Sequence, residues 1–383
     1  MFRPVIQKTR TLVLMASVNI LLIFWVFNST LIEKSSNYDE KLNSAKTMQS
    51  ALSVLKEHVR NQEMPIFRSI DPNMTGLIFK EESLIRSSNG NLEDKQSTLK
   101  PNFAAFILDK LLSAGIKRGD TIAVCLTGSN PGANIALYSA AKSLDITPVI
   151  ITSVSSSTWG ATDPNFTWLD MESILIKNNI FNYKTTNASL GGKGDCLKRT
   201  TNFGGTESRN LIKKAIKRND IDLIPYYLEK DSSNLLRSID YRLNLFEDYL
   251  PIENYSAYVN IGGGVSSVGI GGVAKIKNKV NYSPQQILEK ELNHSVMKFF
   301  AEENIPVVNV MSINKIIDGV LPPGAQKYEI GNGDIYFTER YNLLVVWIST
   351  IFSVFMIIGI GYVSHKQVNE RLKSFSLDED SVL

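Results

Sequence analysis

The chain contains little cysteine and little histidine, with two cysteines and three histidines in 383 residues. It has no Cys-x-x-Cys pair and no Cys/His spacing typical of zinc sites, so we predict neither a metal site nor a bound cofactor. Cys125 and Cys196 could pair in an oxidising compartment. Cys125, however, lies in an apolar, strand-like run, which favours a small buried thiol over a disulfide.

The phosphate-binding motifs of nucleotide enzymes are also absent. The GGKGD sequence at 191–195 lacks the preceding Gly-x-x-x-x-Gly and the following Ser or Thr of a P-loop. The VNIGGGVSSVGIGG sequence that begins at Val259 lacks the spacing of a dinucleotide site. The formal net charge is only +3, which gives no sign of a nucleic-acid-binding surface. We therefore predict neither ATP-driven chemistry nor nucleic-acid binding.

Two long uncharged runs are present, at 11–32 and at 341–364. Each is long enough to cross a bilayer as one helix. The alternative for the first run is a cleaved signal peptide, but no convincing small-x-small cleavage site follows it, so we predict an uncleaved anchor. The alternative for the second run is a buried core helix. Trp347 near its outer end and the polar HKQVNERLKS sequence after it argue against that alternative.

Basic residues gather beyond the end of each run that is nearer to a chain terminus, whereas the opposite flanks mix acidic and basic residues. These basic residues are Arg3, Lys8, Arg10, Lys366, Arg371 and Lys373. By the positive-inside rule, the two ends of the chain, 1–10 and 365–383, face the cytoplasm. The sequence thus predicts a two-pass membrane protein with residues 33–338 on the outer side of the bilayer.

A short amphipathic helix is expected within 33–63. Its apolar residues recur at steps of three and four: Ala45, Met48, Leu52, Leu55 and Val59. A stalk that pairs with another copy in a homo-oligomer would show this pattern, and so would a helix that packs on the chain's own domain. The second interpretation is favoured because the pattern covers only about two heptads.

Residues 64–338 have the pattern of one α/β domain. The part before residue 102 carries turn signals around short apolar runs, which predicts loops and short strands. Helices are predicted at 102–116, 131–144, 166–179, 207–219, 234–249, 283–304 and 312–320, and strands at 121–127, 147–153, 256–261 and 305–310. This alternation predicts an open, mostly parallel, Rossmann-like sheet with flanking helices.

A Gly-Ser-Asn-Pro-Gly turn separates the strand 121–127 from the helix 131–144. Backbone N–H groups, a hydroxyl and a helix N-terminus meet there, at the carboxyl end of a strand, where open α/β sheets bind ligands. We therefore predict that Gly128, Ser129, Asn130 and Gly132 bind an anionic group such as a carboxylate or a phosphate. The alternative is that Ser129 or Asn130 only caps the helix.

Two further polar turns are predicted at the same edge of the sheet. Their candidate ligand-binding residues are Ser156, Ser157, Trp159, Gly160, Asp170 and Glu172 after the second strand, and Gly262, Gly263 and Gly264 after the third. For Asp170 and Glu172 the alternative is that they are solvated acids, which complement the dipole at the start of a helix.

Ser129 is the candidate nucleophile, and Asp170 is a candidate catalytic partner. The surrounding LTGSNPG sequence lacks the Gly-x-Ser-x-Gly pattern. The histidine of the globular part, His294, lies in a predicted helix rich in Glu and Lys, where a surface position is expected. A Ser-His-Asp triad is therefore not predicted, and a pairing of Ser129 with Asp170 or Asp195 stays open.

Four segments resemble a known family. They are DPNMTGLI, SNPGANIALYSAAKSL, TPVIITSVSSSTWGATDPNFTWLDME and AYVNIGGGVSSVG. Together they resemble the bacterial family named poly-gamma-glutamate system protein, over nearly the whole chain. The resemblance implies a protein of the bacterial cytoplasmic membrane, associated with the enzymes that make and export poly-gamma-glutamate, an anionic polymer. It carries over no catalytic residues.

Two functions are predicted from these observations. The first is a membrane-anchored accessory protein that binds poly-gamma-glutamate synthase components in the lipid bilayer and handles the polymer through its carboxylates. The second is an extracytoplasmic hydrolase or transferase that acts on amide or ester bonds of an anionic capsule polymer, with Ser129 as nucleophile.

Overall fold

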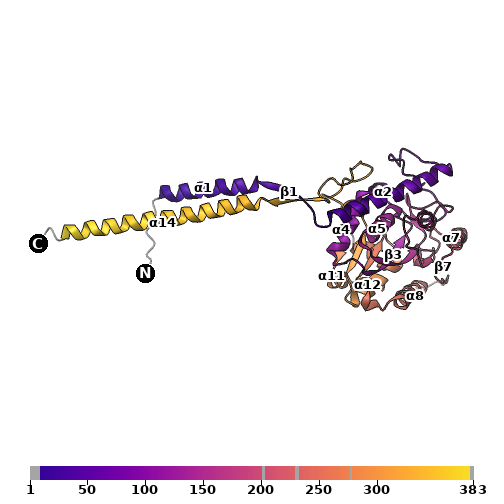
Figure 1. Ribbon diagram of the computed structural model, residues 1–383. Coiled ribbons are helices and arrows are strands. Elements are labelled where there is room, and N and C mark those ends of the chain that lie inside the picture. Colours follow the sequence, from indigo (N-terminus) through magenta and orange to yellow (C-terminus); the bar gives the residue numbers. More distant parts are fainter. Residues whose placement is uncertain (1–8, 201–202, 229–232, 277, 380–383) are drawn as a thin grey trace. The chain divides into compact units, whose positions relative to one another are not determined.

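The computed structural model describes residues 9–200, 203–228, 233–276 and 278–379, with the backbone alone for 371–379 (Figure 1). The chain forms two compact units. The first comprises the residues up to Ser35 together with those from Phe337 onward, and the second comprises Ser36–Tyr336.

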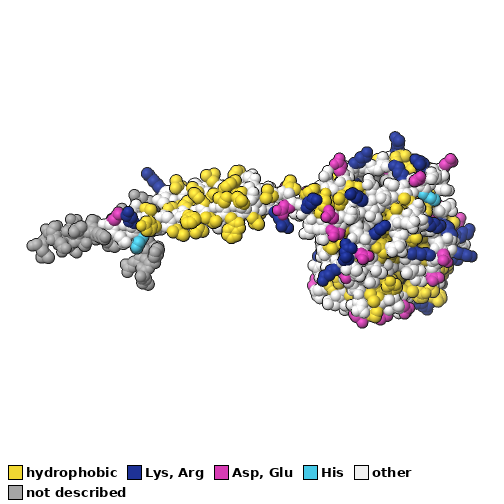
Figure 2. Space-filling view, viewed as in Figure 1, with side chains coloured by type: hydrophobic (Ala, Val, Ile, Leu, Met, Phe, Trp, Pro, Cys, Tyr) yellow, Lys and Arg dark blue, Asp and Glu magenta, His cyan; other side chains and the backbone are white. Residues whose placement is uncertain are grey.

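Two long apolar helices, α1 (Thr9–Phe27) and α14 (Leu343–Glu379), make up most of the first unit. Both are long and apolar enough to cross a membrane, and the apolar part of α14 lies within Leu343–Glu370. Hydrophobic side chains cover their outer surface, as Figure 2 shows. Exposed apolar surface of this extent is typical of a segment that lies in lipid.

A two-stranded antiparallel sheet follows α1 and precedes α14. Its strands, β1 (Thr30–Lys34) and β11 (Phe337–Tyr341), pair from Thr30 opposite Tyr341 to Lys34 opposite Phe337. Between the helices, Ser353 Oγ donates to Asn19 Oδ1 at 2.7 Å. The helices run antiparallel, in line with the antiparallel pairing of the strands that follow α1 and precede α14 (Figure 1). The predicted first span, 11–32, was too long because its last residues pair with β11 instead of continuing the helix.

The residues that predicted the orientation of the spans fall largely outside the described part of the chain. Arg3 and Lys8 are not among the described residues, and the side chains of Arg371 and Lys373 are not described either. The orientation of the two helices in a membrane therefore stays a prediction.

The second unit begins with α2 (Tyr38–Asn61), which packs on α4 (Asn102–Ser113) and α5 (Pro131–Leu144). In its apolar stripe, Ala45, Met48, Leu55 and Val59 are buried and Leu52 is half-buried. Burial of each large side chain contributes about 1.5–3 kcal/mol. The stripe thus packs on the chain's own domain.

A seven-stranded sheet lies at the centre of the second unit, in the order β7-β6-β4-β3-β8-β10-β9. Its strands are β3 (Thr121–Thr127), β4 (Thr147–Ser153), β6 (Asn187–Ser189), β7 (Asp222–Leu223), β8 (Ala257–Ile261), β9 (Asn281–Tyr282) and β10 (Val307–Val310). Neighbouring strands are parallel except for β9, which is antiparallel to β10. The chain is therefore a mixed α/β fold with a mostly parallel sheet, as predicted.

Helices flank this sheet (Figure 1). Besides α2, α4 and α5 they are α3 (Leu92–Thr98), α6 (Trp168–Lys177), α7 (Thr206–Arg218), α8 (Ser233–Tyr249), α9 (Val265–Val268), α10 (Gly272–Lys275), α11 (Pro284–Leu288), α12 (Val296–Glu302) and α13 (Ile313–Ile316), with single 3-10 turns at η1 (Lys193–Asp195) and η2 (Ile252–Asn254). A short parallel pair, β2 (Arg86–Ser88) and β5 (Ser156–Ser157), lies outside the main sheet.

Both faces of the sheet are covered. In β3, successive residues from Ile122 to Leu126 are all buried, and successive side chains of a strand point to opposite faces. On one face, Ala123 and Cys125 pack in a cluster with Phe246 of α8 and Phe300 of α12. A strand that is buried on both faces reads as a continuous apolar run, which is why β3 was recognisable in the sequence.

Besides the first span, three predicted segments differ from the structure. The helix predicted at 312–320 forms only over Ile313–Ile316, as α13. The helix predicted at 283–304 is two helices, α11 and α12. The helix breaks because Leu292 enters the core, Asn293 Nδ2 donates to the backbone O of Ile270, and Ser295 caps α12. The segment before residue 102, predicted as loops and short strands, contains the helix α3.

Candidate functional site

A cavity lies at the carboxyl ends of the central strands. The chain adds β4, β6 and β7 on one side of β3, and β8 and β10 on the other, so the winding reverses between β3 and β8. Open α/β sheets bind ligands beyond such a reversal point. The cavity there measures about 680 Å³. It is lined by the loops that follow β3, β4, β6, β8 and β10 and by residues from the segment 87–95. Serines, glycines and two lysines dominate its lining, and we call it the polar cavity.

Lys95, on α3, connects that helix to the Gly-Ser-Asn-Pro-Gly turn. Its Nζ donates to the backbone O of Ser129 at 2.5 Å and to Oδ1 of Asn130 at 2.9 Å. Gly132 permits the close packing of α3 on α5, because a Cβ at this position would lie 2.6 Å from the backbone O of Thr98. The turn that was predicted to present N–H groups to an anion thus directs two of its oxygens to the amino group of Lys95.

The third partner of Lys95 Nζ is Ser157 Oγ, at 2.9 Å. Burial lowers the pKa of Lys95 from 10.5 to about 7, because the cation loses its hydration, and the charge of Asp94 opposes this effect. A neutral amino group has two N–H donors and one lone pair. The oxygens of Ser129 and Asn130 can only accept, so the lone pair is left to accept the hydroxyl proton of Ser157. Neutral Lys95 is therefore placed as a base for Ser157.

Neighbouring backbone fixes the position of Ser157. The short ladder between β2 and β5 places it opposite Ser88, and the next residue, Thr158, donates its backbone N–H to Ser88 O at 3.1 Å. The backbone N–H of Ser157 donates to Ser129 Oγ at 3.1 Å. The hydroxyl of Ser129 therefore supports the Ser157 backbone, whereas the hydroxyl of Ser157 is the one that contacts the base.

The glycine turn after β8 forms another wall of the polar cavity. Gly262 has a φ of +94°, and a Cβ there would lie 2.2 Å from Thr127 Oγ1 at the end of β3. Only glycine combines this backbone conformation with so close an approach. The turn 262–264 thus brings the ends of β3 and β8 together at the cavity.

The structure brings some of the predicted ligand-binding residues together and not others. Those that line the polar cavity are Ser129, Asn130, Ser157, Gly262, Gly263 and Gly264. Those that do not line it are Gly128, Gly132, Ser156, Trp159, Gly160, Asp170 and Glu172. Several of these have packing roles. A Cβ at Gly128 would lie 2.5 Å from Val154 O, for example, and Ser156 is fully buried.

The two predicted acids lie at α6. Asp170 caps the start of this helix through Thr167 and accepts hydrogen bonds from Arg218 at 2.5 Å and 2.7 Å. Glu172 is buried and accepts hydrogen bonds from the hydroxyl of Tyr138 and from Thr185 N, the latter at 3.0 Å. Burial raises the pKa of Glu172 to about 7. In none of these hydrogen bonds is Ser129 or Ser157 the partner of either carboxylate.

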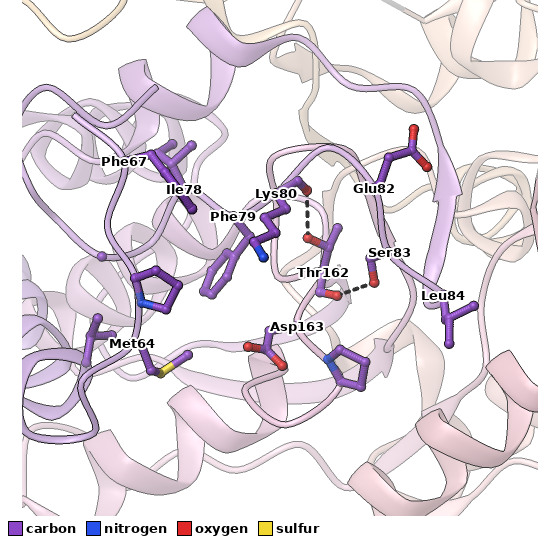
Figure 3. A pocket seen from close by; sticks show the side chains of 14 residues that line it. Met64, Phe67, Ile78, Phe79, Lys80, Glu82, Ser83, Leu84, Thr162 and Asp163 are labelled. Carbon is purple, nitrogen blue, oxygen red and sulfur yellow. Dashed lines mark hydrogen bonds between the residues drawn. The ribbon is translucent and has the colours of Figure 1, made fainter. Parts of the chain in front are cut away.

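A second cavity, of about 460 Å³, lies near the C-terminal end of α2 (Figure 3). Its lining is largely apolar, with Met64, Phe67 and Ile78 on one side and Leu84 on the other. Ser83 Oγ donates to the backbone O of Thr162 there. Among the residues described as lining this cavity, no hydroxyl contacts a base as Ser157 contacts Lys95, so the polar cavity is the candidate site.

The described residues contain no group of three or more His, Cys, Asp or Glu side chains that could hold a metal ion. Cys125 and Cys196 are both buried free thiols. Comparison of the chain with models of protein families, with curated proteins and with solved structures gives no match. The chemistry of the polar cavity must therefore carry the functional conclusion.

Sequence reasoning missed Lys95, because α3 is short and has no apolar stripe. Its start nevertheless carries a local signal. Asn91 Oδ1 accepts from the backbone N–H of Asp94 at 3.0 Å, and Glu93 and Asp94 lie in the first turn. A capping residue followed by acids marks the start of a helix. That signal could have located α3, although it could not have shown what Lys95 contacts.

Proposed function

We propose that the second unit is a serine-dependent hydrolase or transferase of amide or ester bonds. Ser157 is the nucleophile and Lys95 is the general base. The observation that carries the proposal is the 2.9 Å contact between Ser157 Oγ and a buried Lys95 Nζ whose other contacts are to acceptors. This assignment moves the nucleophile from Ser129, the residue selected from the sequence, to Ser157.

The proposed reaction proceeds in two steps. In the first, Ser157 Oγ attacks the carbonyl carbon of the substrate while Lys95 Nζ accepts the hydroxyl proton, and Lys95 then gives that proton to the departing amine or alcohol. In the second, water or an acceptor amine loses a proton to Lys95 and attacks the acyl-serine ester. Ser157 Oγ then recovers its proton from Lys95. No redox change is required.

Covalent acylation tests this proposal directly. Full-length protein in detergent is mixed with p-nitrophenyl acetate, the burst of p-nitrophenol is followed, and the acetylated residue is mapped by peptide mass spectrometry. We expect a burst and an acetyl group on Ser157, both lost in Ser157→Ala. In Ser129→Ala the adduct should persist on Ser157. Acetylation at other residues only, or a burst that survives Ser157→Ala, would refute the assignment.

We also propose a second function, that of an accessory protein of bacterial poly-gamma-glutamate synthesis and export. The observations in its favour are the two apolar helices, which offer a surface for membrane partners, and the resemblance noted in the sequence. Deletion of the gene should then lower polymer yield, and the synthase components should co-purify with this protein from membranes. Normal yield together with the absence of those components would refute it.

The location that accompanies both functions is the bacterial cytoplasmic membrane, with both termini cytoplasmic and the second unit extracytoplasmic. Reporter enzymes fused after Leu383 and inserted near Gly90 test this topology. We expect signals from opposite compartments. Equal signals from both positions would exclude the two-pass arrangement.

A further inference from the structure

A strained turn at 191–197 borders the polar cavity. It contains the GGKGD sequence, which is not a P-loop. Five of its seven residues have positive φ angles: Gly191, Gly192, Gly194, Asp195 and Leu197. Glycine adopts positive φ readily, whereas Asp195 and Leu197 do so only with backbone strain. Such a concentration of strain requires support from the surrounding structure and is typical of functional positions.

A buried ion pair provides that support. Asp195 Oδ2 lies 2.7 Å from Arg242 Nη1, and each side chain is only 1% exposed. Asp195 also accepts from Ser189 Oγ at 2.9 Å and from Ser238 Oγ at 2.5 Å. Arg242 Nη2 reaches Ser153 Oγ, in the cavity lining, at 3.3 Å. The turn is thus fixed to the end of β4 by charge-assisted bonds in a dry environment.

What this turn presents to the polar cavity is Lys193. The side chain is exposed, lines the cavity, and has no hydrogen-bond or ion-pair partner in the described part of the chain. Asp94, the acidic residue of the lining, accepts from the backbone N–H of Asn314 at 2.9 Å and forms no ion pair with Lys193 among the described residues. Lys193 therefore brings an ammonium group without an ion-pair partner in the described chain to the cavity that Ser157 also lines.

We infer that the polar cavity takes an acyl substrate with a free carboxylate, which the ammonium of Lys193 binds while Ser157 attacks the ester or amide carbonyl. Asp195 and Arg242 are positioning residues that hold the turn. This inference rests on the proposed acyl transfer and adds the substrate class. One charge-assisted hydrogen bond corresponds to an affinity change of about ten- to a hundredfold.

Two esters that differ only in charge test the inference. Mono-p-nitrophenyl adipate carries a carboxylate, and its methyl ester has the same chain without one. We expect Lys193→Met to raise KM for the charged ester by about ten- to a hundredfold, with KM for the methyl ester unchanged. Lys214→Met, an exposed lysine of α7 outside the cavity, removes the same charge and should change neither value.

A binding measurement separates this inference from the proposed function. Adipate is titrated calorimetrically into full-length Ser157→Ala protein, with and without the added Lys193→Met change. If wild-type protein hydrolyses neither ester but the binding is present and depends on Lys193, the acyl-transfer function fails and the carboxylate site stands. If both esters react with equal KM in wild-type and Lys193→Met proteins, the carboxylate site is refuted and the acyl transfer stands. Absence of both hydrolysis and binding refutes both.

Discussion

The pH dependence of the acylation rate tests the proposed role of Lys95 as the general base. Only the neutral amine can accept the proton of Ser157, so the acylation rate follows the neutral fraction of Lys95. With a pKa of about 7, that fraction is about one tenth at pH 6 and about nine tenths at pH 8. The rate should therefore rise about tenfold over this range. A lysine with its usual pKa would be only about 0.3% neutral at pH 8. Burial of Lys95 thus raises the neutral fraction at pH 8 roughly 300-fold.

The assay is the burst of p-nitrophenol from p-nitrophenyl acetate, measured from about pH 5.5 to about pH 9 and corrected for spontaneous hydrolysis. Lys95→Met should remove the burst. The matched control is Lys100→Met, because Lys100 is also buried and has a lowered pKa, about 8, but donates to Pro322 O away from the cavity. A midpoint that stays near pH 7 in Lys95→Met, or a wild-type rate that does not change between pH 6 and pH 8, would refute the role of Lys95.

Three further outcomes are expected from thermal or urea unfolding. Because the pKa of Lys95 is lowered in the folded state, Lys95 is protonated in the unfolded chain but neutral in the folded protein between about pH 7 and pH 10.5. The free energy of unfolding should therefore rise with pH in this window, by at most about 5 kcal/mol. Lys95→Met should flatten this rise, and an unchanged slope would contradict the assignment. The raised pKa of Glu172 has the opposite sign. The folded state holds the proton between pH 4.5 and about 7, so stability should fall as pH rises through this window, by about 3 kcal/mol, and Glu172→Gln should remove that fall. Gly262→Ala should lower stability by about 1–3 kcal/mol because of its contact with Thr127, whereas Gly115→Ala, with a φ of +91° and no atom within 4 Å, should lower it less. If Gly262→Ala and Gly115→Ala lowered the free energy of unfolding equally, the contact with Thr127 would not explain the loss at Gly262.

The fold was largely predictable because its elements are marked locally. β3 and β4 are continuous apolar runs, and α5 begins with Pro131 in its first turn. The break between α11 and α12 was not predictable, because it depends on the contact of Asn293 with Ile270, 23 residues earlier. The strand β1 was missed for the same reason. Its pairing partner, β11, lies about 300 residues away in the chain.

The sequence alone determined the α/β class, the edge of the sheet at which polar turns gather, and the two apolar helices. Each of these follows from composition and periodicity within a single segment, and needs no knowledge of what that segment touches. Only the tertiary structure decided which serine meets a base. Lys95 and Ser157 are 62 residues apart, and their contact requires both the packing of α3 on α5 and the β2–β5 ladder. The lowered pKa of Lys95 comes from the burial that this packing creates.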